Sequence, residues 1–245
     1  MIGGKWKENM NMEGMNKMIN PNLLKLAGRT GNKDLSEDTS KEESITVNTQ
    51  DNIEIKGIGK FQYIPSINLY VSDNKILHGN NWYKCHEELN KQELLMLTIP
   101  EFIHYIKYLK QNPNSNNTKI LDDILTVRSP WRAEWLDAKF DRNNITYNKI
   151  NNNKLEEVTE TLEECLMEDK LPGIDLEYWL NNHTNQGLPL KNTPKGKLYY
   201  YHTRNDTVAW FDAFSVRAGL DCGGGPDGSD SDLGVRAARL VGKKS

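Results

Sequence analysis

A two-residue alternation runs through the C-terminal part of the chain, between Val208 and Leu240. Successive side chains of a β-strand point to opposite faces, so an alternating pattern predicts an extended segment with one buried face. The positions predicted to face a core are small or apolar: Phe211, Ala213, Ser215, Ala218, Leu220, Cys222, Ser229, Ser231 and Leu233. This segment is therefore expected to lie on the main sheet of the fold.

The intervening positions are predicted to face solvent or a ligand, and to form one contiguous exposed surface. They are Asp212, Phe214, Val216, Gly219, Asp221, Gly223, Gly224, Gly225, Asp227, Gly228, Asp230 and Asp232. Because glycine is unsuited to a regular strand, 223–232 is predicted to be a loop with extended pieces.

Three interpretations of this segment follow from its residues alone. Asp227, Gly228, Asp230 and Asp232 resemble the start of an EF-hand calcium loop, but a closing Glu and flanking helices are missing. The triple glycine 223–225 lacks the Lys-Ser/Thr of a P-loop and the spaced glycines of a Rossmann turn. A polar surface hairpin is the third interpretation, and neither a metal nor a cofactor is predicted.

The remaining composition excludes several functional classes. Among 245 residues, Lys plus Arg number 31 and Asp plus Glu number 34, giving a net charge of −3, whereas nucleic-acid-binding domains usually carry a basic excess. Hydrophobic residues make up 37%, which predicts one core wrapped in long polar loops. No apolar run approaches the roughly 20 residues of a membrane span, and the N-terminus lacks a secretory pattern. Cytoplasmic synthesis is expected, with no membrane partner.

The first fifty residues are predicted to be a weakly ordered extension, because a polar, charged and Ser/Thr-rich run buries little apolar surface. Order is expected from residue 51 to 245. Strands are predicted within 53–71, across 140–150 around Asn143-Asn144, and over 198–201. Helices are predicted over 82–89, 100–109, 120–127, 155–167 and 175–180, and from Ser129-Pro130 onward, with 187–196 irregular.

The predicted core joins both halves of the chain. Trp82, Phe102, Trp210, Phe211, Leu220, Leu233 and Val235 are expected to be largely buried in a single core with Trp131 or Trp135. The three cysteines, Cys85, Cys165 and Cys222, are odd in number and widely spaced, which predicts reduced thiols. The five histidines are scattered, so no catalytic residue is proposed.

From Trp210 to Arg236 the chain follows the pattern W-F-x-A-x-S-x-R-A-x-L-x-C-x-x-x-P-x-x-S-x-S-x-L-G-V-R. This pattern resembles the C-terminal variable region of diversity-generating retroelement variable proteins from archaea, bacteria or viruses. In that family the x positions derive from template adenines copied with errors. The resulting codons do not encode Trp, Met, Lys, Gln or Glu, and none of these occupies an x position here.

The resemblance implies a C-type lectin fold of the α+β class over about 55–240. In that fold, short helices pack on a small antiparallel sheet that carries a long irregular insert. Residues 82–89, 100–109, 111–198 and 233–236 match its elements in order. Paired cysteines and sugar-binding motifs of vertebrate lectins are missing from the sequence, so calcium-dependent sugar binding is not implied.

The same resemblance implies a non-catalytic display protein whose variable region, 208–240, binds a protein or another surface ligand. Its display on a virion or a cell surface stays open, and a monomer is expected over an oligomer. Two alternatives are an enzyme of the formylglycine-generating type, which shares the fold, and a calcium-dependent binding module. The enzyme uses a cysteine pair in its C-terminal part, whereas Cys222 stands alone there.

Overall fold

The computed structural model describes residues 52–126, 129–152, 154–214 and 217–242. These residues belong to one compact unit. The predicted N-terminal extension, residues 1–50, lies outside the described residues.

Twelve strands and four helices are formed by the described residues. The first seven strands are β1 (Ile53–Ile55), β2 (Gly59–Ile64), β3 (Leu69–Ile76), β4 (Leu95–Met96), β5 (Arg132–Asp141), β6 (Asn144–Asn151) and β7 (Lys154–Thr161). The other five are β8 (Lys170–Ile174), β9 (Leu198–Tyr201), β10 (Thr207–Phe214), β11 (Arg217–Gly224) and β12 (Leu233–Leu240). The helices are α1 (Trp82–Lys91), α2 (Ile99–Gln111), α3 (Ser115–Leu125) and α4 (Leu176–Asn181).

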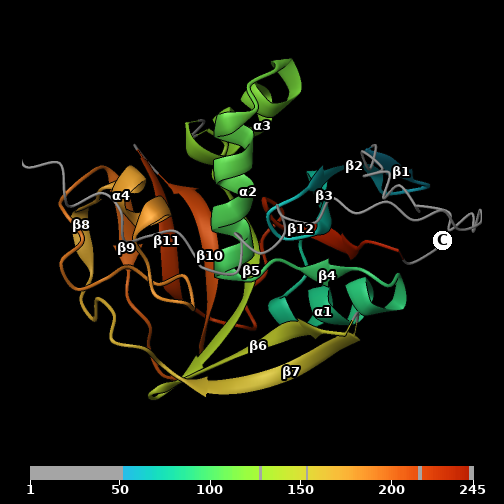
Figure 1. Cartoon of the computed structure of the whole chain (residues 1–245). Helices are drawn as coiled ribbons and strands as arrows, with labels where there is room; N and C mark the ends of the chain where they lie inside the picture. The colour runs from blue at the N-terminus through green and yellow to red at the C-terminus, as the bar shows by residue number, and fades with distance from the viewer. Residues whose placement is uncertain (1–51, 127–128, 153, 215–216, 243–245) are drawn as a thin grey trace, which may run out of the picture. The chain divides into compact units, whose positions relative to one another are not determined.

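All twelve strands belong to one sheet, whose main path runs β1-β2-β3-β12-β5-β10-β11-β9-β8 (Figure 1). Strand β4 pairs with β12, and the β6–β7 hairpin continues from β5. The pairs β5–β12 and β9–β11 are parallel, while the other pairs are antiparallel. The described part of the chain therefore mixes α and β structure, on a sheet larger than the small antiparallel one expected.

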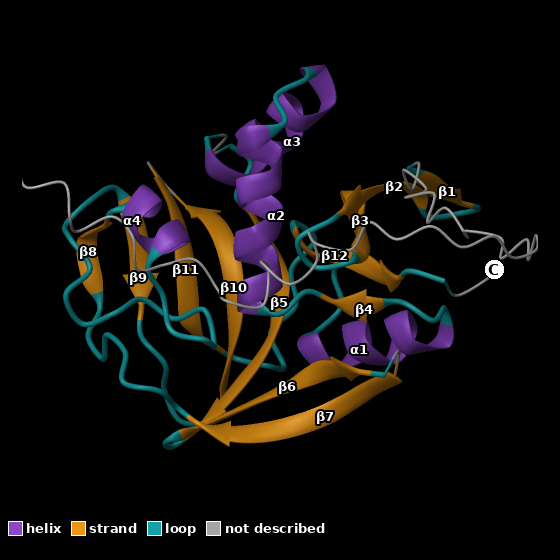
Figure 2. Cartoon of the chain, viewed as in Figure 1, coloured by secondary structure: helices purple, strands orange, loops and turns teal. Residues whose placement is uncertain are grey.

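Helix α2 is specified by its own N-terminal residues. The Thr98 hydroxyl accepts a hydrogen bond from the Glu101 backbone N–H, and the Glu101 carboxylate accepts one from the Thr98 N–H at 2.8 Å. This capping box, with Pro100 in the first turn, satisfies donors that a helix start leaves open. Figure 2 shows α2 in front of the sheet, over β10 and β5, and the rings of Phe102 on α2 and Phe211 on β10 have centroids 5.1 Å apart.

The buried hydrophobic residues form two clusters, so the prediction of a single core is wrong. Phe102, Phe211 and Leu220 lie in the larger cluster, which α2, α3 and α4 help to cover. The smaller cluster contains a tryptophan from α1 and one from β5. Its members include Trp82, Trp135, Leu233 and Val235, with Trp131 and Trp210 only partly buried beside them.

The helix predicted from Ser129-Pro130 is wrong, because the segment that follows is the central strand β5. This strand pairs with β10 on one side and with β12 on the other. Eight of its ten residues are buried. Pairing on both edges outweighs a local helix-start signal, since tertiary context overrides weak propensities.

The helix predicted over 155–167 is also wrong. Residues Lys154–Thr161 form β7, which pairs with β6 along its whole length. Asn152, in the turn between the two strands, has a φ of 49°, a conformation that Asn tolerates better than most residues. The stretch 111–198, expected to be irregular, thus contains α3, the strands β5 to β8, and α4.

Other predicted elements are confirmed. Helices are present over most of 82–89, 100–109 and 175–180, and α3 covers the first part of 120–127. The hairpin around Asn143-Asn144 forms as β5 and β6, and 198–201 is strand β9. No helix in the described part of the chain is long and apolar enough to cross a membrane.

Candidate ligand-binding surface

The β10–β11 hairpin carries the alternating segment. Phe211 pairs with Leu220 and Ala213 with Ala218 in its antiparallel register. These four residues and Cys222 are each at most 5% exposed. The prediction that these five residues face a core is confirmed.

The opposite face of the same hairpin is more accessible. Asp212, Asp221 and Gly223 are partly exposed there. Strand β9 continues this face, because it pairs in parallel with β11 and aligns Tyr199 with Gly219 and Tyr201 with Asp221. We call Tyr199, Tyr201, Asp212, Asp221 and Gly223 the hairpin surface.

Several predicted positions depart from the expected pattern. Gly219 and Gly224, expected to be exposed, are buried, and Ser229 and Ser231, expected to face the core, are exposed. The strand pattern ends with β11 at Gly224, so period two no longer describes 225–232. Ser215, Val216 and the side chain of Phe214 lie outside the described residues.

Neighbouring side chains explain why two glycines are buried. A Cβ atom at Gly219 would lie 2.7 Å from the Cβ of Tyr199, and one at Gly224 would lie 2.5 Å from the ring of Trp210. A Cβ at Gly223 would meet the Arg204 Nη1, the mobile end of a long side chain. Gly223 therefore accepts side chains at lower cost than Gly219 or Gly224.

Residues 225–232 form a loop between β11 and β12, whereas Gly223 and Gly224, also predicted to lie in this loop, are the last residues of β11. Gly225, Asp227, Gly228 and Asp230 are exposed, and Asp232 is partly exposed. The backbone is nevertheless anchored, because the Pro226 carbonyl accepts a hydrogen bond from the Trp82 N–H at 3.1 Å. The Asp230 carbonyl accepts another from Gly79 at 3.0 Å. Side chains on this loop can therefore vary over a held backbone.

We predict that Gly224→Ser lowers the free energy of unfolding by about 1–3 kcal/mol, since its Cβ would overlap the Trp210 ring. The matched change Gly225→Ser should stay within about 0.5 kcal/mol, as no atom lies within 4 Å of a Cβ built there. Urea unfolding of both variants measures the difference. Equal losses would contradict this view of the two positions.

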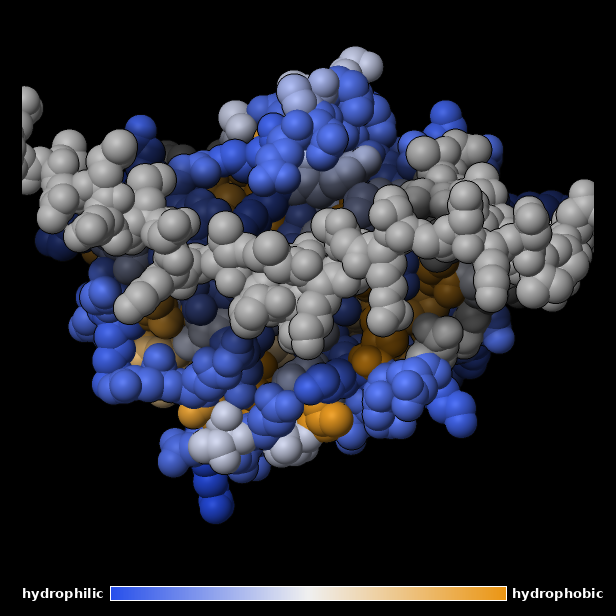
Figure 3. Space-filling model, in the orientation of Figure 1, coloured by the Kyte–Doolittle hydropathy of each residue, from blue (hydrophilic) through white to orange (hydrophobic). Residues whose placement is uncertain are grey.

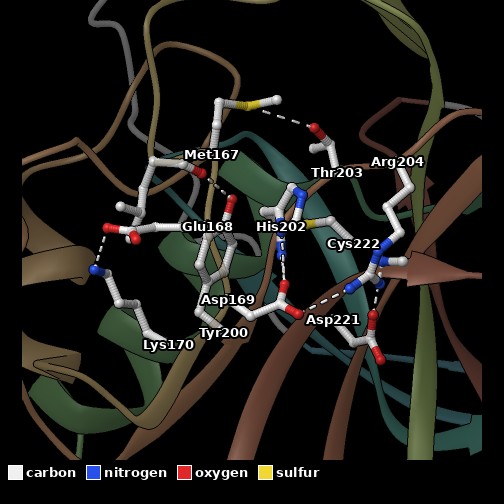
Figure 4. A network of polar contacts seen from close by, with 12 residues as sticks. Met167, Glu168, Asp169, Lys170, Tyr200, His202, Thr203, Arg204, Asp221 and Cys222 are labelled. Carbon is white, nitrogen blue, oxygen red and sulfur yellow. Dashed lines mark hydrogen bonds and ion pairs between the residues drawn. The ribbon is translucent and has the colours of Figure 1, made fainter.

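A polar network borders the hairpin surface, and sequence reasoning missed it (Figure 4). The Asp169 carboxylate accepts hydrogen bonds from the His202 N–H at 3.0 Å and from Arg204 Nη2 at 2.8 Å. Its Oδ1 lies 2.6 Å from His202 Nδ1. The Asp221 Oδ1 accepts a hydrogen bond from the Gly223 N–H at 2.7 Å. The network thus supports the conformation of the β11 end and of the turn after β9.

The carboxylates of this network differ in their electrostatics. Burial raises the pKa of Asp221, although the Gly223 N–H and the Arg204 charge oppose that shift. For Asp169 burial acts in the same direction, but hydrogen bonds from His202 and the Arg204 charge leave its pKa lowered. Burial also raises the pKa of Tyr201, and the nearby Asp221 charge adds to it. Carboxyl groups and tyrosine rings thus lie together on the hairpin surface and in the network beside it.

One sequence signal could have indicated the tyrosines. Tyr199 and Tyr201 are two residues apart in a predicted strand, so they share a face, and their ring centroids lie 6.5 Å apart. The guanidinium carbon of Arg217 lies 4.7 Å from the Tyr199 ring centroid. No sequence signal indicated the role of Asp169, because its partner Arg204 is 35 residues away in the sequence.

Thiol and metal chemistry receive little support from the described residues. Cys85, Cys165 and Cys222 are buried and unpaired with one another. Burial raises the pKa of each thiol, to about 12 for Cys85, which disfavours the reactive thiolate. Within the described ranges, no group of three or more His, Cys, Asp or Glu side chains is arranged to hold a metal ion.

Comparisons with known proteins identify no relative of this chain. No family model matches the chain, and neither a curated protein nor a solved structure is significantly similar to it.

Proposed function

We propose that this chain is a non-catalytic ligand-binding protein of the retroelement-diversified kind, with a C-type lectin fold. Its ligand, a protein or another surface molecule, would bind the hairpin surface and the 225–232 loop. The proposed contact positions are all partly or fully exposed. They are Asp212, Asp221, Gly223, Gly225, Asp227, Gly228, Asp230 and Asp232.

The observation that carries this proposal is the difference in burial between the two faces of the β10–β11 hairpin. Its core-facing residues are at most 5% exposed and supply buried contacts, whereas Asp212, Asp221 and Gly223 on the other face are partly exposed and bury no large apolar side chain. Surface substitutions usually change stability by less than about 0.5 kcal/mol. Such a hairpin can keep its backbone while Asp212, Asp221 and Gly223 change, whereas Gly219 and Gly224 are restricted by Tyr199 and Trp210.

The chemistry of the surface favours a basic ligand. Asp212, Asp221, Asp227, Asp230 and Asp232 are all acidic, and two tyrosines lie beside the first two. Tyrosines in antibody paratopes supply large contact area at low entropic cost, and small polar residues supply adaptable hydrogen bonds. Complementary charge mainly raises the association rate and the selectivity.

Two experiments test the proposal. The DNA downstream of the coding region should hold a near-identical repeat that differs at adenines, followed by a reverse transcriptase gene. A library with Asn, Ser and Tyr at Asp221, Gly223, Gly225, Asp227 and Gly228 should largely remain folded. A matched library at Phe211, Ala213, Leu220 and Cys222 should largely unfold. Absence of the repeat, or equal folded fractions in both libraries, would overturn the proposal.

The calcium alternative has a direct test. A calcium loop that forms only in the folded state would add about 2.7 kcal/mol at a hundredfold excess of calcium over the dissociation constant. We expect millimolar calcium and chelator to leave the melting temperature alike. A calcium-dependent rise that disappears in Asp230→Asn would show instead that the loop is a metal site.

A further inference from the structure

A cavity of about 560 Å³ lies among β2, β3, α3 and β12, outside the proposed binding surface. None of its lining residues is a candidate variable position. Figure 3 shows that hydrophilic side chains predominate over α3, the helix that contributes to one wall. The cationic lining residues are Lys60, Lys75, Lys119 and Arg236.

The carboxylates in the lining already have partners. Asp73 accepts a hydrogen bond from Gln62 Nε2 at 2.7 Å and another from Asn116 Nδ2 at 3.0 Å. The Asp123 Oδ1 lies 3.1 Å from the Nε of Arg132. These acids are therefore held by other protein groups, although the Asp123 charge still favours the charged form of Lys75.

Arg236 is likewise engaged. Its guanidinium lies 2.9 Å from the Glu134 carboxylate and donates to two backbone carbonyls of β3. By contrast, the ammonium groups of Lys60, Lys75 and Lys119 form no hydrogen bond or ion pair with any residue that the structure describes. Lys75 is half-buried, and burial lowers its pKa despite the opposing charges of Glu134 and Asp123. Burial thus disfavours the charged form of Lys75 more than the nearby carboxylates favour it, so an anionic ligand in direct contact would stabilise its ammonium group.

We propose that this cavity binds a small phosphorylated molecule, with Lys75 contacting it from within and the exposed Lys60 and Lys119 from the rim. Lysine binds phosphate as a point charge, and three lysines match a polyanion better than a single carboxylate. Arginine suits planar bidentate pairing with carboxylates, and the arginine here is occupied by Glu134. The volume lies within the range of small-molecule sites, roughly 300–1,000 Å³.

Titration calorimetry of the full chain with pyrophosphate tests this assignment. We expect saturable binding, weakened about tenfold or more by Lys75→Met, which corresponds to about 1.4 kcal/mol. Lys119→Gln, at an exposed position, should also weaken it. The control Lys154→Gln, on exposed β7, should change the dissociation constant less than about twofold.

Several outcomes would overturn the proposal. These are no saturable binding at millimolar pyrophosphate, equal weakening by the Lys154 control, or unchanged binding in both cavity variants. If Lys75→Met does not fold, judged by its far-ultraviolet circular dichroism, Lys119→Gln decides the test. Citrate binding as tightly as pyrophosphate would overturn the assignment to phosphate. Because no variable position lines the cavity, failure here leaves the proposed display function intact.

Discussion

Phe211→Ala is expected to lower the free energy of unfolding by about 3–5 kcal/mol, because a large core ring is removed. Phe211 is 2% exposed on β10. Its ring centroid lies 5.1 Å from that of Phe102 on α2 and 6.3 Å from that of Trp179 on α4. Both helices would lose a contact with the sheet. Denaturant unfolding followed by tryptophan fluorescence measures the change.

The matched control is Leu171→Ala, since Leu171 is 56% exposed on β8. Its loss should stay within about 0.5 kcal/mol. A loss below about 1 kcal/mol for Phe211→Ala would contradict the view that the core-facing side of the hairpin carries its stability. It would also weaken the proposed separation between stability and display.

Glu134→Gln should cost about 3–5 kcal/mol, because it leaves the buried Arg236 guanidinium without its counter-charge. The side chains of Glu134 and Arg236 are 4% and 2% exposed. Because so little of the arginine side chain is exposed, solvent compensates for only a small part of the lost carboxylate. Urea unfolding at neutral pH gives the free-energy difference.

An exposed ion pair provides the comparison. Glu177, with a side chain 62% exposed, pairs with Lys110, and Glu177→Gln should cost less than about 1 kcal/mol. Changing Glu134 and Arg236 together to Met should recover part of the loss, since no charge then stays buried. Similar costs for Glu134→Gln and Glu177→Gln would rule out a special role for the buried pair.

The sequence by itself determined those features whose signals are local. The helix predicted over 100–109 forms as α2, and the structure shows that a capping box of Thr98 and Glu101, within four consecutive residues, fixes its start. The alternation of Phe211, Ala213 and Leu220 predicts the buried face of the hairpin. Both patterns act through neighbours along one element, so no knowledge of distant partners is needed.

The tertiary structure decided which strands pair with each other. This pairing gave some segments a secondary structure different from the one that their sequence predicts. The segment after Ser129-Pro130 has a helix-start signal, yet it is the central strand because β10 and β12 pair with both of its edges. Parallel pairing of β9 with β11 brings Tyr201 beside Asp221, and β12 brings Arg236 to Glu134 across 102 residues. Such contacts depend on long-range pairing and burial, which local propensity does not encode.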